Sequence, residues 1–128
     1  MKRSVFMVIA GVMAIFFGLT MVFNPGQMLD MVAIDTNLST RVVLQWMGCP
    51  LIAIGIMNIL ARNDGGSLGL RAIMIGNILL HFLGAGIDVF DFANGYLKVS
   101  GLAMGAVVHG VLIIGFGFYL SRLAKSPG

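Results

Sequence analysis

Four apolar stretches of about 20 residues divide the chain, and nearly every charged residue falls between them. They cover residues 4–23, 42–61, 68–87 and 99–121, and only Arg71 interrupts them. At about 1.5 Å per helical residue, each can cross a hydrocarbon core of roughly 30 Å. Lipid cannot satisfy an exposed backbone, and nothing alternates with the period of two expected for strands. The pattern predicts an all-α integral membrane protein, a bundle of four transmembrane helices.

The first span ends at Asn24, Pro25 and Gly26, because proline removes a backbone donor and glycine frees the chain. Asn24 can cap a new helix, and Pro25 suits its first position. We therefore expect a short helix over residues 27–34, lying in the outer membrane interface between the first two spans.

The remaining connections contain capping residues at the starts of helices. Thr36 and Ser39 are candidate caps for the second span. The connection at residues 62–67 is short and rich in turn-forming residues, and it ends in Ser67, a candidate cap for the third span. A turn this short makes the second and third helices antiparallel neighbours.

The 128 residues are 59% hydrophobic and 10% charged, with a mean hydropathy of +1.00. This composition leaves no room for a second, soluble domain, so one transmembrane domain covers residues 1–128. The net charge of +3 could suggest a nucleic-acid partner. However, the basic residues flank apolar spans and form no patch with aromatic residues, so we expect the lipid bilayer, and no nucleic acid, as partner.

Positive charge is distributed unevenly between the two ends of the spans, and the positive-inside rule turns this bias into a topology. The N-terminus, the connection at 62–67 and the C-terminus carry six basic residues and one acidic residue, whereas the opposite ends carry two basic and four acidic residues. We therefore expect both termini to face the cytoplasm.

The chain lacks the residues that most catalytic chemistries require. Cys49 is the only cysteine, which excludes an internal disulfide and any cysteine cluster for a metal. The chain has no glutamate, no paired carboxylates within the spans, no recognisable Ser-His-Asp arrangement and no phosphate-binding loop. We therefore expect no enzyme activity and no metal site.

Polar side chains inside spans are costly and usually face the interior of a bundle. Those of the third span follow one stripe, because Asn77, His81 and Asp88 fall within about 60° of one another at 100° per residue. His109 lies near the middle of the fourth span, at a depth similar to that of His81. Gln45, next to Trp46 in the second span, adds a further polar group.

Three interpretations of the histidines stay open. Each imidazole can hydrogen-bond a backbone carbonyl or a neighbour such as Asn77 and set the helix register. Alternatively, His81 or His109 donates to a quinone, lipid or other small molecule beside Trp46, with Asp88 at the outer mouth of the pocket. Finally, the two histidines ligate a haem from opposite sides. Proton movement along the stripe is a further option, although the spans hold no second acid.

Small residues recur at four-residue spacing in three of the spans and predict close helix packing, either within the chain or against a partner or second copy. They are Ala10, Ala14 and Gly18 in the first span, Ala72 and Gly76 in the third, and Gly101 and Gly105 in the fourth.

The layout resembles small bacterial four-helix inner-membrane proteins, the DoxX-like group and its uncharacterised relatives. The resemblance rests on the Phe23-Asn24-Pro25 end of the first span, Ala61-Arg62, Gly76-Asn77 followed by His81 and Asp88, and His109-Gly110. It implies a four-helix fold in a bacterial inner membrane. The group has no single established activity, and this chain lacks the extra cysteines of a thiol-redox role.

These observations together favour a non-enzymatic accessory or structural subunit of a larger membrane complex, bound to another membrane protein or to further copies of itself. A chain with almost no mass outside the membrane has mainly its helix surfaces to offer a partner. The alternative is a membrane protein that binds a small molecule, quinone or haem through His81 and His109.

Overall fold

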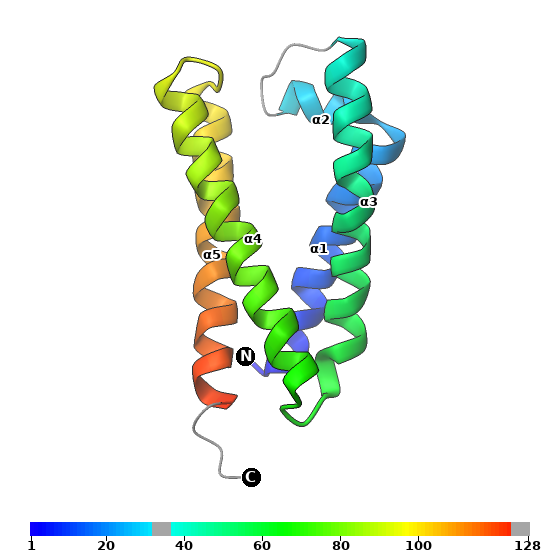
Figure 1. The fold of residues 1–128 in the computed structure, drawn as a ribbon, viewed down its shortest axis with the longest axis vertical. Helices are drawn as coiled ribbons and strands as arrows, with labels where there is room; N and C mark the ends of the chain where they lie inside the picture. Colours follow the sequence, from blue (N-terminus) through cyan, green and yellow to red (C-terminus); the bar gives the residue numbers. More distant parts are fainter. Residues whose placement is uncertain (32–36, 124–128) are drawn as a thin grey trace.

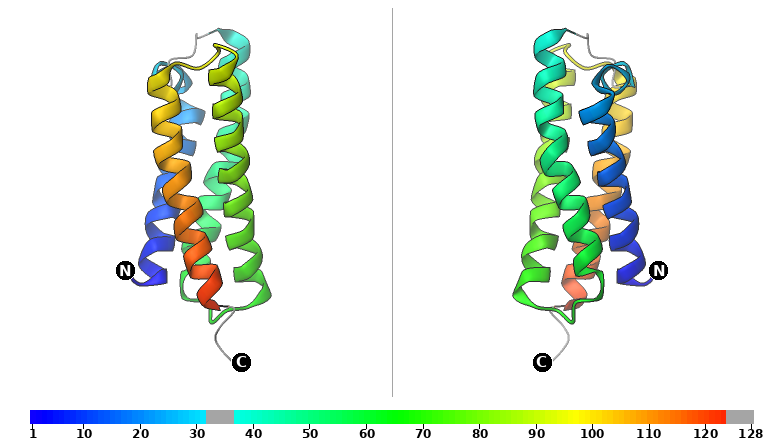
Figure 2. Two further views of the ribbon diagram at one scale, coloured as in Figure 1. Left: turned by 90° about the vertical axis from the view of Figure 1, so that its left-hand side faces the viewer. Right: turned by 90° about the vertical axis from the view of Figure 1, so that its right-hand side faces the viewer.

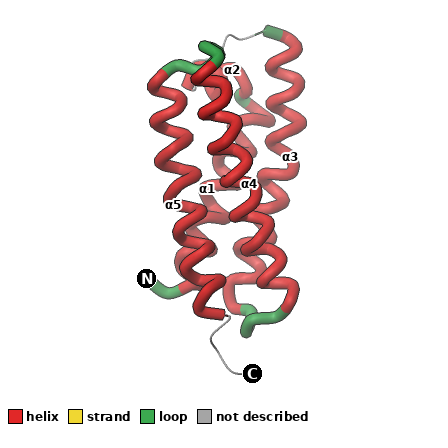
Figure 3. Tube along the Cα trace, turned by 60° about the vertical axis from the view of Figure 1, so that its left-hand side comes forward, coloured by secondary structure: helices red, strands yellow, loops and turns green. Residues whose placement is uncertain are grey.

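The computed structural model describes residues 1–31 and 37–123, which are helical nearly throughout (Figure 1). Four helices are long and apolar enough to cross a membrane: α1 (Arg3–Phe23), α3 (Leu38–Leu60), α4 (Leu68–Ala93) and α5 (Val99–Leu123). A single 3-10 turn, η1 (Ala61–Asn63), extends α3, and the described residues contain no strand (Figure 3). The predicted all-α class with four candidate spans is confirmed, although α3 and α4 extend beyond their apolar stretches.

A short helix, α2 (Pro25–Met31), follows α1 and begins two residues earlier than predicted. Met28 and Leu29 are buried against the bundle, whereas Gln27 and Asp30 are exposed. Because one side of α2 is apolar and the other polar, it packs against the bundle with its charge turned outward. Residues 32–34 of the predicted helix lie outside the described residues.

The cap of α3 differs from the prediction. Thr36 lies outside the described residues, and Ser39 lies within the first turn of the helix. The cap is Asn37, whose side-chain oxygen accepts a hydrogen bond from the Thr40 N–H, while the Thr40 hydroxyl accepts one from the Asn37 N–H, both at 2.9 Å. The prediction was wrong because it considered single residues, whereas this reciprocal capping box satisfies two backbone donors at once.

The helices form two antiparallel pairs, α1 with α3 and α4 with α5. Figure 1 shows the pairs converging at the end that holds the N-terminus and the 62–67 turn, and diverging toward the end that holds α2; Figure 2 shows the same helices from the sides. The buried core lies where they converge, and Phe6 of α1 meets Phe116 of α5 edge to face, 4.9 Å between ring centroids. The remaining core residues are Met7, Ala10, Leu70, Met74 and Leu112.

The α1–α3 pair is held together by close approach of the two backbones. A Cβ added to Gly11 would lie 2.7 Å from the Gly55 carbonyl oxygen, and one added to Gly18 would lie 2.8 Å from that of Gly48. Seven residues separate the two glycines on each helix, so they recur on one face after two turns. Glycine is required at these crossings because any side chain would meet the partner backbone.

At the end where the helix pairs converge, three side chains donate hydrogen bonds to backbone carbonyls. The Arg3 guanidinium donates to the Asp64 carbonyl, Arg71 Nη2 donates to the Leu123 carbonyl at 3.0 Å, and the Tyr119 hydroxyl donates to the Met1 carbonyl at 2.6 Å. These bonds connect α1, α4 and α5 to parts of the chain far away in sequence. They fix both helix pairs at this end.

The turn between α3 and α4 is organised by Asp64. Its carboxylate accepts hydrogen bonds from the Ser67 hydroxyl at 2.7 Å and from the N–H groups of Ser67 and Gly66. These bonds, that of the Ser67 hydroxyl first, lower the pKa of the Asp64 carboxyl below its ordinary value. Ser67 Oγ accepts from the Leu70 N–H, which confirms Ser67 as the cap of α4, and Gly66 supplies the positive φ of 116°.

Candidate functional site

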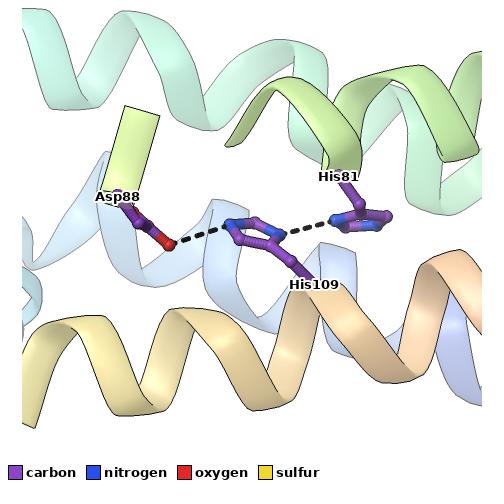
Figure 4. Close-up of polar contacts among 3 residues, drawn as sticks. All are labelled: His81, Asp88 and His109. Carbon is purple, nitrogen blue, oxygen red and sulfur yellow. Dashed lines mark hydrogen bonds and ion pairs between the residues drawn. The ribbon is translucent and has the colours of Figure 1, made fainter. Parts of the chain in front are cut away.

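The polar stripe of α4 meets His109 of α5, and three titratable side chains form a line (Figure 4). The Nδ1 atoms of His81 and His109 lie 3.0 Å apart, and His109 Nε2 lies 3.6 Å from Asp88 Oδ2. The ring centroids are 5.2 Å apart, and the ring planes are inclined by 42°. His109 therefore stands between His81 and Asp88, with one ring nitrogen directed to each.

Two glycines make room for this arrangement. A Cβ added to Gly84 of α4 would lie 2.9 Å from the His109 ring, and one added to Gly105 of α5 would collide with the Asp88 carboxylate. Because the imidazole lies over one glycine and the carboxylate over the other, α4 and α5 approach closely without displacing either polar group. Gly105, one of the residues predicted to pack helices, lies against the Asp88 side chain of α4.

The three side chains of the site differ in their exposure to solvent. His81 is 9% exposed, whereas the side chains of His109 and Asp88 are 23% and 25% exposed. The Oδ2 atom of Asp88 is nevertheless buried and has no hydrogen-bond partner. Asp88 lies five residues from the end of α4, about 8 Å along the axis, so the line runs from near the helix end into the bundle.

Asn77, one turn before His81, does not bond to the histidines. Its Nδ2 donates to Asn58 Oδ1 of α3 at 2.9 Å, and Asn58 Nδ2 donates back to Asn77 Oδ1 at 3.0 Å. Both amides are almost fully buried, with 4% and 1% exposure. This reciprocal amide pair joins the two helix pairs where they converge, and Asn77 thus stabilises the fold next to the site.

Gln45 and Trp46 lie away from the histidines, on α3. Gln45 Nε2 donates to the Val22 carbonyl at 2.9 Å and satisfies a free acceptor at the end of α1. Trp46 is 77% exposed on the outer surface of the bundle. The structure therefore brings together only His81, His109 and Asp88 of the six predicted ligand-binding residues.

The predicted packing residues also separate into two groups. Ala10, Gly18 and Gly101 are buried, Ala14 is partly buried, and Gly105 contacts Asp88. By contrast, Ala72 and Gly76 are exposed, and a Cβ added to Gly76 would meet nothing within 4 Å. Gly11, Gly48 and Gly55 also pack closely, but they do not belong to the four-residue pattern of small residues. The seven-residue glycine spacing shared by the first two spans was the signal that could have found them.

The geometry of the pair limits which cofactors fit. Metal–imidazole bonds of about 2 Å on opposite sides of an iron place the two nitrogens about 4 Å apart, whereas the Nδ1 atoms here are in hydrogen-bond contact. The two Nδ1 atoms are therefore too close together to hold an iron between them, and the described ranges contain no cluster of His, Cys, Asp or Glu suited to a metal ion. The arrangement can hold and exchange protons.

No protein-family model, curated protein or solved structure matches this chain. The resemblance to DoxX-like proteins therefore stays a prediction.

Proposed function

We propose that this protein is a non-enzymatic accessory subunit of a membrane complex, and that a transmembrane helix of its partner packs against α5. The four apolar helices support an integral membrane location. The charge bias supports cytoplasmic termini, and the resemblance to DoxX-like proteins supports a bacterial inner membrane. In this orientation α2, with its exposed Gln27 and Asp30, lies in the outer interface.

The observation that carries the proposal is an unoccupied glycine face on α5. Gly110 and Gly117 are seven residues apart, and a Cβ added to either would meet nothing within 4 Å. The branched and aromatic side chains around them are largely exposed, with 66% exposure for Val107 and 74% for Ile114. We call this surface the α5 glycine face; it comprises Val107, Gly110, Val111, Ile114, Gly117 and Phe118.

The packing of α1 against α3 is an example of how a glycine face holds two helices together. The same seven-residue glycine spacing on α1 and α3 brings two backbones into contact, and those glycines have no free space around them. The opposite side of α5 packs inward through Leu112 and Phe116. The α5 glycine face matches the packed spacing, but a Cβ added to either glycine meets no other described residue. The face therefore fits a helix from another membrane protein.

The test is substitution of Gly110→Ile and Gly117→Ile in the full chain, purified in mild detergent from its native membrane. Both sites are open, so we expect the helical circular dichroism to be retained while the co-purifying partner is lost. Gly86→Ile is the matched control, because Gly86 is exposed on α4 and its Cβ would also meet nothing within 4 Å. Retention of the partner by both α5 variants would contradict the proposal.

Cross-linking through a cysteine at Ile114 separates the two kinds of partner. A second copy of the chain gives a symmetric adduct of twice its mass, whereas a different subunit gives an adduct of another mass. We expect a different subunit, and a symmetric adduct would make the protein a homo-oligomer.

The small-molecule alternative is less well supported by the site. Three of the four imidazole nitrogens are directed to one another or to Asp88, which leaves only His81 Nε2 for a quinone carbonyl, on a buried side chain. A visible absorption spectrum and mass spectrometry of the purified protein test this alternative. A bound quinone or a haem band would favour it over the accessory role.

A further inference from the structure

We infer that Asp88, His109 and His81 form a binding site for one proton, held by the three side chains together as an electrically neutral unit inside the membrane. The inference does not depend on the accessory role or on the α5 glycine face. It follows from the order of the three groups, from the contact between the two Nδ1 atoms, and from the unpartnered oxygen of Asp88.

The contact between the imidazoles requires that one of the two Nδ1 atoms carries a hydrogen and the other does not. Two nitrogens 3.0 Å apart attract only when one carries hydrogen and the other does not, because two bare nitrogens or two N–H groups repel. If His109 donates through Nδ1, His81 accepts through Nδ1. A neutral His109 then has a bare Nε2, and this is the nitrogen that faces Asp88.

A bare Nε2 on His109 needs a donor, and Asp88 can supply one only as a carboxylic acid. Its Oδ2 is buried without a hydrogen-bond partner, which is costly for an ionised oxygen and is resolved by a proton on it. In this state all three groups are neutral. The Asp88 hydroxyl faces His109 Nε2, and the His109 Nδ1–H donates to His81.

A second state has the same total charge. The proton moves from Asp88 Oδ2 to His109 Nε2, so the O–H bond breaks and an N–H bond forms. Asp88 becomes a carboxylate and His109 an imidazolium, which still donates to His81 through Nδ1. Both states hold one more proton than a carboxylate beside two neutral imidazoles, and both avoid the net charge that is expensive in hydrocarbon.

The surrounding helices contain nothing that would replace this proton. Asp91, one turn further along α4, is a second acidic residue and brings no positive charge to Asp88. The only charged residues of the other three long helices are Arg3, Arg41 and Arg122, each in the first or last turn of its helix. Apart from His109, no basic side chain of the described residues forms an ion pair with Asp88.

The site is also closed at one end. Beyond His81 the polar stripe continues only to Asn77 and Asn58, whose amides do not titrate and are bonded to each other. Asp88 lies near the end of α4 and is the most exposed of the three side chains. The proton therefore enters and leaves through Asp88.

The test is a proton count by solid-state NMR on the full chain in lipid bilayers at pH 7, with 15N-labelled histidine and 13C-labelled aspartate. Two histidines and five aspartates keep the spectra simple. We expect either a protonated Asp88 carboxyl with two neutral rings, or an ionised Asp88 with one imidazolium. An ionised Asp88 beside two neutral rings would overturn the inference, as would two imidazolium rings.

Asp88→Asn sharpens the count, because the amide imitates the protonated acid and donates to His109 Nε2. We expect two neutral rings in this variant and the loss of one bound proton. Asp91→Asn is the matched control and should keep the wild-type count. An imidazolium that persists in Asp88→Asn would overturn the inference, and the wild-type spectrum alone decides it if this variant does not fold.

Discussion

The two helix pairs bring their helices into close contact in different ways. Between α1 and α3, glycines allow backbone to meet backbone, and no titratable side chain lies at the crossings. Between α4 and α5, glycines instead make room for an imidazole and a carboxylate. Packing alone holds two helices together in lipid, so the cost of burying His81, His109 and Asp88 is not needed for association. Close backbone packing therefore accounts for the first pair, whereas the second pair also encloses titratable side chains that its packing does not require.

The largest effect is expected from a substitution that disrupts the glycine crossing between α1 and α3. Gly55→Leu places a side chain where Cβ alone would lie 2.6 Å from the Gly11 carbonyl oxygen. Overpacking of adaptable cores costs about 1–3 kcal/mol, and here the obstacle is backbone, so we expect a loss of at least about 3 kcal/mol. Unfolding by SDS in mixed micelles measures it. Gly86→Leu is the control, and equal stability of the two variants would show that the crossing is not tightly packed.

A smaller effect is expected from removing the amide pair that joins the two helix pairs. Asn58→Leu or Asn77→Leu leaves a buried amide without its partner, which we expect to cost about 1–2 kcal/mol. The double variant removes both amides and should lose less than the sum of the single losses. The same SDS assay gives a double-mutant cycle, with an expected coupling of about 0.6–1.7 kcal/mol. A coupling of zero would mean that the amides do not join the pairs in the membrane.

The smallest effect concerns the turn outside both interfaces. The pKa of Asp64 is lowered in the folded state by Ser67, so its contribution to stability is complete above the ordinary value of 3.8 and is lost as the pH falls below it. Because the carboxyl is exposed, we expect a slight effect. Asp64→Asn should be slightly less stable than wild type at pH 7 and equal to it at the acidic end. A difference independent of pH would exclude the carboxylate as its cause.

The sequence predicted the elements well because hydrophobic length alone defines a transmembrane helix. It also placed Asn77, His81 and Asp88 on one face, since residues on one helix have a fixed angular relation. It did not predict that Gln45 would bond to Val22, or that Trp46 would lie away from the histidines. Those outcomes depend on how α3 is rotated against α1, and an almost uniformly apolar helix has no polar side to fix that rotation.

The sequence by itself determined the number of spans, their approximate limits and the residues able to carry charge inside them. Only the tertiary structure decided which of these residues meet. It joined His109 to Asp88 and His81 within one helix pair and paired Asn77 with Asn58 across the two. Among the described residues, it left open space beside Gly110 and Gly117. The physical reason is that in lipid hydrophobicity drives helices into the membrane but does not choose between their faces, which close packing and a few hydrogen bonds select.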